Sequence, residues 1–118
     1  MGNSGSFNRV RKFCMALTDT TEAETLGQPT FRVAGKSYCV LEEYKGEQAV
    51  AVKVGLPVQR EFLKDDRFYK TPHLGQQGWV SLRLGGRFDW SEVDDLIRGS
   101  YRLMARRSTA QSRSLKRR

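Results

Sequence analysis

Residues 31–54 read FRVAGKSYCVLEEYKGEQAVAVKV, and this stretch decides the fold. It contains three runs rich in β-branched and aromatic residues, and Ala34-Gly35 and Lys45-Gly46 separate them. Short turns that contain glycine join antiparallel neighbours, whereas parallel strands need a longer crossover. The stretch therefore predicts an antiparallel meander of three strands, at residues 31–33, 36–43 and 48–54.

The alternation of side chains assigns the two faces of these strands. In residues 36–43, Tyr38 and Val40 fall on one face, and Cys39 and Leu41 fall on the other. In residues 48–54, three valines share one face, and the opposite face carries two alanines and Lys53.

The flanking sequence predicts helices at both ends of the chain. Val10, Phe13, Cys14 and Leu17 have helical spacing, which predicts a helix over residues 6–19. A second apolar stripe predicts a helix over residues 90–105. Between them we expect a loop at 20–29, a short helix from Pro57 to about Asp65, a strand or extended link at 68–71, and a strand at 79–84. This order indicates an α+β fold in two layers, with an antiparallel sheet flanked by N- and C-terminal helices.

Length and composition exclude several classes of protein. The chain has 118 residues, which is room for one domain. Its longest apolar run is Ala49 to Val52, far short of the ~20 residues of a membrane-spanning helix. The start of the chain carries no apolar secretory signal. Two cysteines cannot form a disulfide framework, so we expect a cytoplasmic protein. Nothing in the sequence decides its oligomeric state, and a monomer is the default. Gly2 and Ser6 fit a myristoylation pattern, but we expect no membrane association.

The chemistry of an enzyme is missing from the sequence. Cys14, Cys39 and His73 lack the spacing of metal ligands, and no phosphate-binding or dinucleotide-binding motif occurs. Cys14 lies on the apolar stripe of its helix, so we expect it to be a small buried hydrophobic residue and not a redox group. We therefore expect no catalytic residue, no metal site and no cofactor.

Positive charge is concentrated at the C-terminal end. The chain has 21 lysines and arginines against 13 acidic residues, a net charge of +8. Six of those cations and none of the acids lie at residues 106–118, so residues 1–105 carry a net charge of only +2. We divide the chain into a flexible N-terminus at 1–6, a folded domain at 7–105 and a disordered basic tail at 106–118. The tail either attracts phosphates or is a solvated end that aids solubility.

Several residues of the folded part are candidates for contact with a partner. Arg98 and Arg102 lie on the polar face of the C-terminal helix, and Arg106 and Arg107 continue it into the tail. His73, in a polar loop, is either a ligand contact or a histidine bonded to backbone. Trp79 is either a core residue or a platform on which bases stack.

The ordered set of short motifs resembles the MmcQ/YjbR family. The residues that carry the resemblance lie between 7 and 106 and are Phe31-Arg32-Val33, Gly35-Lys36, Ala51-Val52-Lys53, Pro72-His73-Leu74, Gly78-Trp79-Val80 and Ser100-Tyr101. The resemblance implies a CyaY-like α+β fold, also described as a double wing, in small bacterial proteins labelled as DNA-binding. It places Lys36, Lys53, His73 and Trp79 on motif positions. Iron binding does not follow, because the first helix carries Arg9, Arg11 and Lys12 where an acidic ridge would be needed.

Two functional hypotheses follow. The first is a non-catalytic protein that binds DNA by phosphate contacts, through Lys36, Lys53, His73, Arg98, Arg102, Arg106 and Arg107. The second is a protein-interaction module or a module for a small anion, in which Lys36, Lys53 and His73 line one concave face. A shared pocket of those three residues would favour the second hypothesis, and a common face of the helix cations would favour the first.

Overall fold

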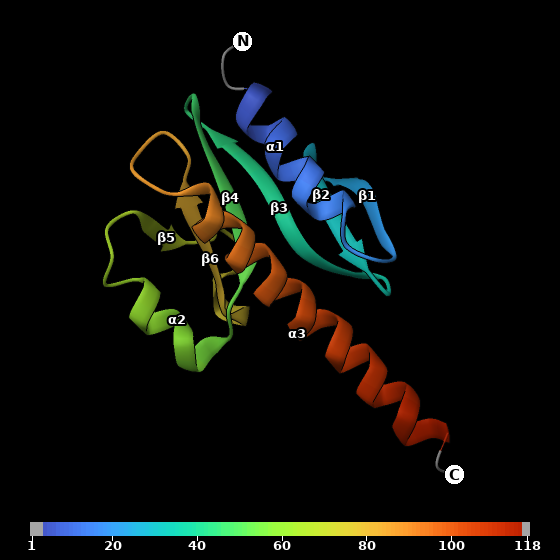
Figure 1. Cartoon of the computed structure of the whole chain (residues 1–118). Helices are drawn as coiled ribbons and strands as arrows, with labels where there is room; N and C mark the ends of the chain where they lie inside the picture. The colour runs from blue at the N-terminus through green and yellow to red at the C-terminus, as the bar shows by residue number, and fades with distance from the viewer. Residues whose placement is uncertain (1–3, 117–118) are drawn as a thin grey trace.

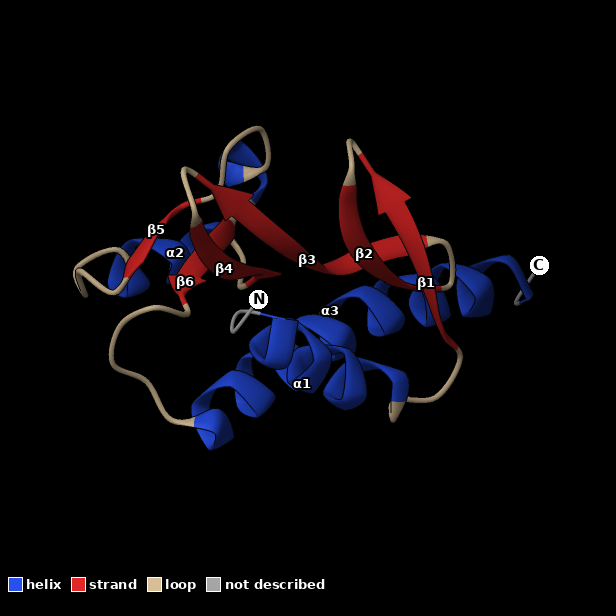
Figure 2. Ribbon diagram, turned by 90° about the horizontal axis from the view of Figure 1, so that it is seen from above, coloured by secondary structure: helices blue, strands red, loops and turns tan. Residues whose placement is uncertain are grey.

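The computed structural model describes residues 4–116, with side chains over 5–43 and 45–106. Six antiparallel strands form one sheet in the order β1-β2-β3-β4-β6-β5, and α1 and α3 cover one of its faces (Figures 1 and 2). The predicted two-layer α+β fold is therefore confirmed. The elements are α1 (Ser4–Met15), β1 (Thr20–Thr25), β2 (Gln28–Val33), β3 (Lys36–Tyr44), β4 (Glu47–Lys53), α2 (Leu56–Phe62), β5 (Phe68–Lys70), the 3₁₀ turn η1 (Gly75–Gln77), β6 (Trp79–Arg83) and α3 (Trp90–Lys116).

Three two-residue turns connect the first four strands. Each turn is a residue followed by glycine, at Leu26-Gly27, Ala34-Gly35 and Lys45-Gly46, and all six residues have φ between 53° and 80°. Positive φ at both positions is the type I′ turn, whose twist matches that of the strands it joins. The turn geometry therefore fixes the register of the hairpins β1–β2, β2–β3 and β3–β4.

The predicted loop at residues 20–29 is wrong. Residues 20–25, TTEAET, form the edge strand β1, which pairs along its whole length with β2. All but one of its residues are polar, so the strand has no apolar alternation to reveal it. Its stability comes from backbone pairing and from the tight turn at Leu26-Gly27.

An irregularity in the pairing of β2 with β3 changes one predicted face. The register shifts between Phe31 and Arg32, so Tyr38 has no direct partner on β2. A bulge of this kind turns two successive side chains toward one side. Tyr38 consequently joins Cys39 and Leu41 in the core under the helices, and the predicted grouping of Tyr38 with Val40 is wrong.

The core lies between the sheet and the two long helices, as the apolar stripes predict. Val10 and Cys14 of α1 and Val93 and Ile97 of α3 are fully buried against the valines of β4 and β6. The buried thiols of Cys14 and Cys39 form a hydrogen bond there. This hydrogen bond, together with burial, raises the pKa of Cys39 well above its usual range. The Cys39 thiol is therefore inert at neutral pH.

Ser100 joins α3 to the sheet at the point where β3 and β4 separate. Its hydroxyl donates to the carbonyl oxygen of Tyr38 at 2.6 Å and accepts from the amide of Lys53 at 3.0 Å. The last recorded pair of these strands is Cys39 with Val52, so Tyr38 and Lys53 are the next residues along. The Ser100 side chain thus occupies the place of a missing ladder hydrogen bond.

The loop at residues 71–78 (the 71–78 loop) crosses the face of the sheet opposite the helices, which we call the outer face. The buried Gln59 of α2 holds it by donating to the carbonyl oxygens of Gly75 and Trp79 at 2.8 and 3.0 Å. Gly78 closes the loop with φ of 89°, and a Cβ there would lie 2.7 Å from the carbonyl carbon of Gly55. Only glycine fits both the conformation and the space.

The C-terminal helix is longer than predicted. We expected the helix to end at 105, but α3 continues to Lys116 and projects beyond the sheet (Figure 1), whereas the division of the chain into domain and tail stays a prediction. Residues 106–116 contain neither glycine nor proline and are rich in arginine and other helix formers, so nothing local ends the helix. At the other end, α1 begins within the expected flexible segment 1–6. Gly2, Arg117 and Arg118 lie outside the described residues. No helix in the described part of the chain has the length and apolarity to span a membrane.

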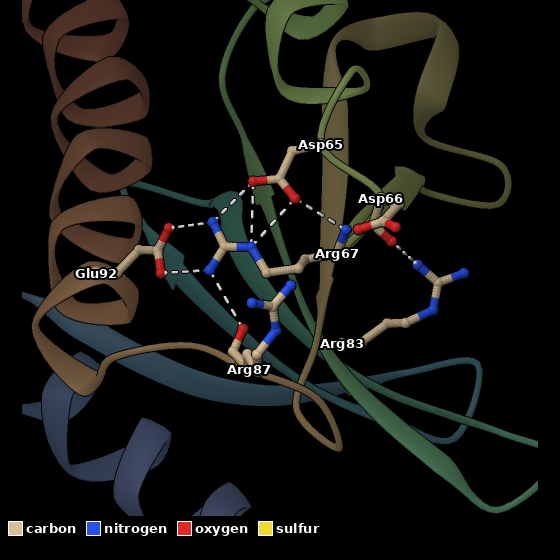
Figure 3. Close-up of polar contacts among 6 residues, drawn as sticks. All are labelled: Asp65, Asp66, Arg67, Arg83, Arg87 and Glu92. Carbon is tan, nitrogen blue, oxygen red and sulfur yellow. Dashed lines mark hydrogen bonds and ion pairs between the residues drawn. The ribbon is translucent and has the colours of Figure 1, made fainter.

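Arg67 connects β5 to the start of α3. Its guanidinium donates to the carboxylates of Asp65 and Glu92, with Nη2 at 2.8 Å from each, and Nη1 also reaches the carbonyl oxygen of Arg87 (Figure 3). The hydrogen bonds from Arg67 lower the pKa of Asp65 from 3.8 to about 2, and they lower that of Glu92 as well. This ion cluster therefore holds the loop before α3 against the sheet edge.

We predict that Ser100→Ala destabilises the protein strongly for so small a change. The substitution leaves a buried amide and a buried carbonyl without partners, which should lower the free energy of unfolding by about 2–4 kcal/mol. Urea unfolding measures this. Ser91→Ala, on the exposed side of the same helix, is the control and should stay within about 0.5 kcal/mol of the wild type. Equal effects of the two substitutions would contradict the role of Ser100.

We predict that the effect of Arg67→Met depends on pH. Asp65 and Glu92 have lowered pKa values in the folded protein, so their contribution is present above about pH 4.5 and is lost as the pH falls toward 2. The difference in unfolding free energy between wild type and variant should therefore be largest at neutral pH and shrink through this range. Chemical unfolding at several pH values measures it, with Arg60→Met as the control. A difference that stays constant with pH would contradict the ion cluster.

Candidate functional site

The helix layer presents a row of arginines to solvent. Arg98, Arg102 and Arg106 follow one another at four-residue spacing on α3, and all three are exposed. Ser100 and Ile97 of the same helix are buried against the sheet. Because residues two apart lie on nearly opposite sides of a helix, the anchoring of Ser100 turns Arg98 and Arg102 outward. We call these three residues the α3 arginine row.

The charges of the row are only partly neutralised. Arg98 makes an ion pair with Asp94 one turn earlier, with Nε 3.0 Å from Oδ2. Exposed pairs of this kind are weak and give way readily to another anion. Within the described part of the chain, no ion pair is recorded for Arg102 or Arg106, and the sequence has no acidic residue after Asp95. The side chain of Arg107 lies outside the described residues.

Cations of α1 lie on the same layer. α1 and α3 run side by side over the sheet (Figure 2), and the guanidinium of Arg9 stacks on the ring of Trp90, 4.8 Å from its centroid. Trp90 is eight residues before Arg98, so Arg9 lies beside the first turn of α3, roughly 12 Å along the helix axis from the start of the α3 arginine row. Lys12 is also exposed, whereas Arg11 is held by Glu22 and Asn8. Arg9 and Lys12 thus lie in the same helix layer as the α3 arginine row.

The structure does not bring Lys36, Lys53 and His73 into one pocket. Lys36 pairs with Val33, whose side chain belongs to the core under the helices. Lys53 lies at the end of β4 and lines a groove between α2 and α3. His73 belongs to the 71–78 loop on the outer face and lines a different cleft. The three predicted residues are therefore spread over both faces of the sheet.

Trp79 is a core residue. It is 3% exposed and packs with Val40 and Ala51 on the outer face of the sheet, under Leu74 of the 71–78 loop. An indole enclosed in this way cannot stack on a nucleic-acid base. Of the two interpretations of Trp79, the core is confirmed.

The outer face carries a polar cluster that the sequence interpretation missed. Glu42 is 6% exposed, and its Oε1 accepts from Ser81 Oγ at 2.7 Å and from the Tyr69 hydroxyl at 3.0 Å. Thr71 Oγ1 completes the chain at 2.9 Å from Ser81 Oγ. Burial, and then the nearby charge of Glu42, raise the pKa of Tyr69 to about 12. A paired Glu42-Glu43 looks solvated in sequence, but Glu42 follows Val40 by two and so shares its covered face.

Comparison with known proteins identifies relatives by family and by fold. The YjbR family model matches residues 15–103. No curated protein matches the chain. Two solved bacterial structures share the fold, and each similarity covers 82% of this chain.

The first is a structural-genomics protein from Pseudomonas syringae, with 18% identity, a TM-score of 0.72 and 97% of its own chain covered. The second is a protein from Deinococcus radiodurans described by the domain name DUF419, with 23% identity, a TM-score of 0.71 and 76% of its chain covered. Because the family model spans most of the sequence, from the end of α1 through the buried part of α3, the chain belongs to the YjbR family.

Proposed function

We propose that the protein is a non-catalytic cytoplasmic protein that binds duplex DNA through its phosphates. The observation that carries this proposal is the α3 arginine row: three exposed guanidinium groups on one rigid helix, two of them without an acidic partner in the described part of the chain. Arginine is well suited to phosphate because its planar donors bind two oxygens at once.

The geometry of the row suits a polyanion. Arg98 and Arg106 are eight residues apart, so the row extends over roughly 12 Å of helix axis. Arg9 and Lys12 of α1 add positive charge to the same helix layer, and the sequence beyond Arg106 adds five further cations and no acid. Such a surface attracts phosphates of any base sequence, so we expect little sequence preference.

The alternative module for a small anion has less support. It requires Lys36, Lys53 and His73 in one concave site, and they are spread over both faces of the sheet. The cleft that contains His73 is lined by Glu42 and Glu43, whose charge would repel an anion. The exposed cations of α1 and α3 lie in one helix layer, which favours DNA.

The test is a titration of a fluorescently labelled duplex of about 20 base pairs with the protein at several salt concentrations, with fluorescence anisotropy as the measure of binding. In R98A/R102A/R106A we expect the slope of log Kobs against log salt to lose about 2.7, from ~0.9 per phosphate contact. The matched control R60A/K64A/R87A removes the same charge from exposed residues of α2 and two loops. Its slope should stay near that of the wild type.

A second variant separates the helix row from the C-terminal end. Substitution of Arg113, Lys116, Arg117 and Arg118 by serine should remove up to about 3.6 of the slope if those residues also bind phosphate. Equal losses in the row variant and its matched control would contradict the proposal. So would wild-type affinity weaker than the ~10⁻⁴ M limit of non-specific binding at physiological salt.

A further inference from the structure

The outer face contains a cleft that the DNA proposal does not use. It lies between the β1–β2 turn and the 71–78 loop and consists of two adjoining hollows of about 360 and 140 Å³. The β3 residues Val40 and Glu42 line the smaller hollow, and Thr30 of β2 lines it beside them. The residues common to both hollows are Leu26, Gln28, Glu42, Pro72 and His73. We call this the outer cleft.

The carboxylate of Glu42 is buried without a cation. No lysine or arginine in the described part of the chain makes an ion pair with it, and its recorded hydrogen bonds come from the hydroxyls of Tyr69 and Ser81. A buried carboxylate is costly unless it is paired. Both hydroxyls donate to Oε1, and a carboxylate can accept about four hydrogen bonds, so Glu42 keeps capacity for further donors.

Neither of the nearby arginines, Arg83 and Arg32, forms an ion pair with Glu42. Arg83 stacks on the ring of Tyr69, but its guanidinium donates to the carbonyl oxygen of Asp66 at 3.0 Å and lies 3.7 Å from Glu47 (Figure 3 shows the contact with Asp66). Arg32 makes one long hydrogen bond, from Nη2 to Thr25 Oγ1 at 3.4 Å, its buried Nε has no partner, and it is not among the residues that line either hollow. The rim adds a second carboxylate, Glu43. The charge that lines the outer cleft is therefore negative.

The remaining walls are apolar. Leu26 is 85% exposed at the tip of the β1–β2 turn, where a bulky apolar residue gains nothing from solvent. Pro72 and Leu74 form the opposite wall, and Val40 forms part of the base. Hydrogen bonds from Gln59 hold the 71–78 loop in place, so this wall of the outer cleft is preformed.

We propose that the outer cleft binds a small organic cation, an ammonium or guanidinium group on a short apolar stem, with Glu42 as its counter-ion. The charged head replaces the missing cation, and the stem lies between Leu26 and Pro72. A free amine and a basic side chain of a peptide share this chemistry. This proposal is independent of DNA binding, because the outer cleft and the α3 arginine row lie on opposite faces of the sheet.

The test uses amide NMR shifts of the full-length protein during titration with n-butylguanidinium and n-butylammonium. We expect saturable shifts at residues of the outer cleft with a Kd of roughly a millimolar, typical of ligands of this size. n-Butanol and butyrate should give no saturable shift there. Nα-acetyl-arginine N-methylamide tests whether the cation is the side chain of a peptide. If it binds more tightly than n-butylguanidinium, the natural ligand is a basic side chain. If it binds more weakly, the natural ligand is a free amine.

Variants decide whether Glu42 is the counter-ion. Glu42→Gln keeps an oxygen for Tyr69 and Ser81 but removes the charge, and it should weaken binding ~10-fold or more. Leu26→Ser should weaken it by a few fold, while Leu56→Ser, an exposed leucine of α2, should not change it. Glu61→Gln, also on α2, is the control for charge.

Binding of n-butanol as tight as that of n-butylguanidinium would overturn the proposal, and so would full affinity in Glu42→Gln. If Glu42→Gln does not fold, two other comparisons still test the site. One compares the affinity of Leu26→Ser and Leu56→Ser for n-butylguanidinium, and the other compares the affinity of the wild type for n-butylguanidinium and for n-butanol. Equal effects in either comparison would overturn the site.

Discussion

The arrangement of both layers depends on one hydroxyl group, that of Ser100. A serine inside a helix normally returns its hydrogen bond to its own backbone, but Ser100 donates to β3 and accepts from β4. It fixes the rotation of α3 about its axis and the position of the helix along the strands. The rotation then determines which side chains face solvent, so Arg98 and Arg102 point away from the sheet because Ser100 points into it.

The two faces of the sheet have different chemistry because successive side chains of a strand point to opposite sides. On β3, Leu41 belongs to the core under the helices and the next residue, Glu42, belongs to the outer face. Ala51 of β4 is small enough for Leu74 of the 71–78 loop to lie close over that outer face. One face therefore supports a cationic helix layer, and the other supports a cleft with a buried carboxylate.

The parts of the fold that the sequence predicts are those with strong local signals. The turns at Ala34-Gly35 and Lys45-Gly46 and the apolar stripes of α1 and α3 indicate the meander and the helices that cover it. The sequence did not predict β1 because its residues are mostly polar, although the turn after it, Leu26-Gly27, is of the same kind as the other two. The bulge at Tyr38 and the burial of Glu42 depend on tertiary contacts, with Ser100 and with Ser81 and Tyr69, which no spacing in the sequence reveals.

The continuity of α3 also changes the meaning of the net charge. In the sequence, most of the excess charge belongs to residues after 105, which read as an appended arm. In the structure, the helix that is anchored at Ser100 passes without a break through Arg102 and Arg106 and on to Lys116. A cation on a rigid helix loses less conformational entropy when it meets a phosphate than one on a flexible chain. Four of the six cations at residues 106–118, Arg106, Arg107, Arg113 and Lys116, belong to α3, so the phosphate contacts that we propose would cost less conformational entropy there than on a free arm.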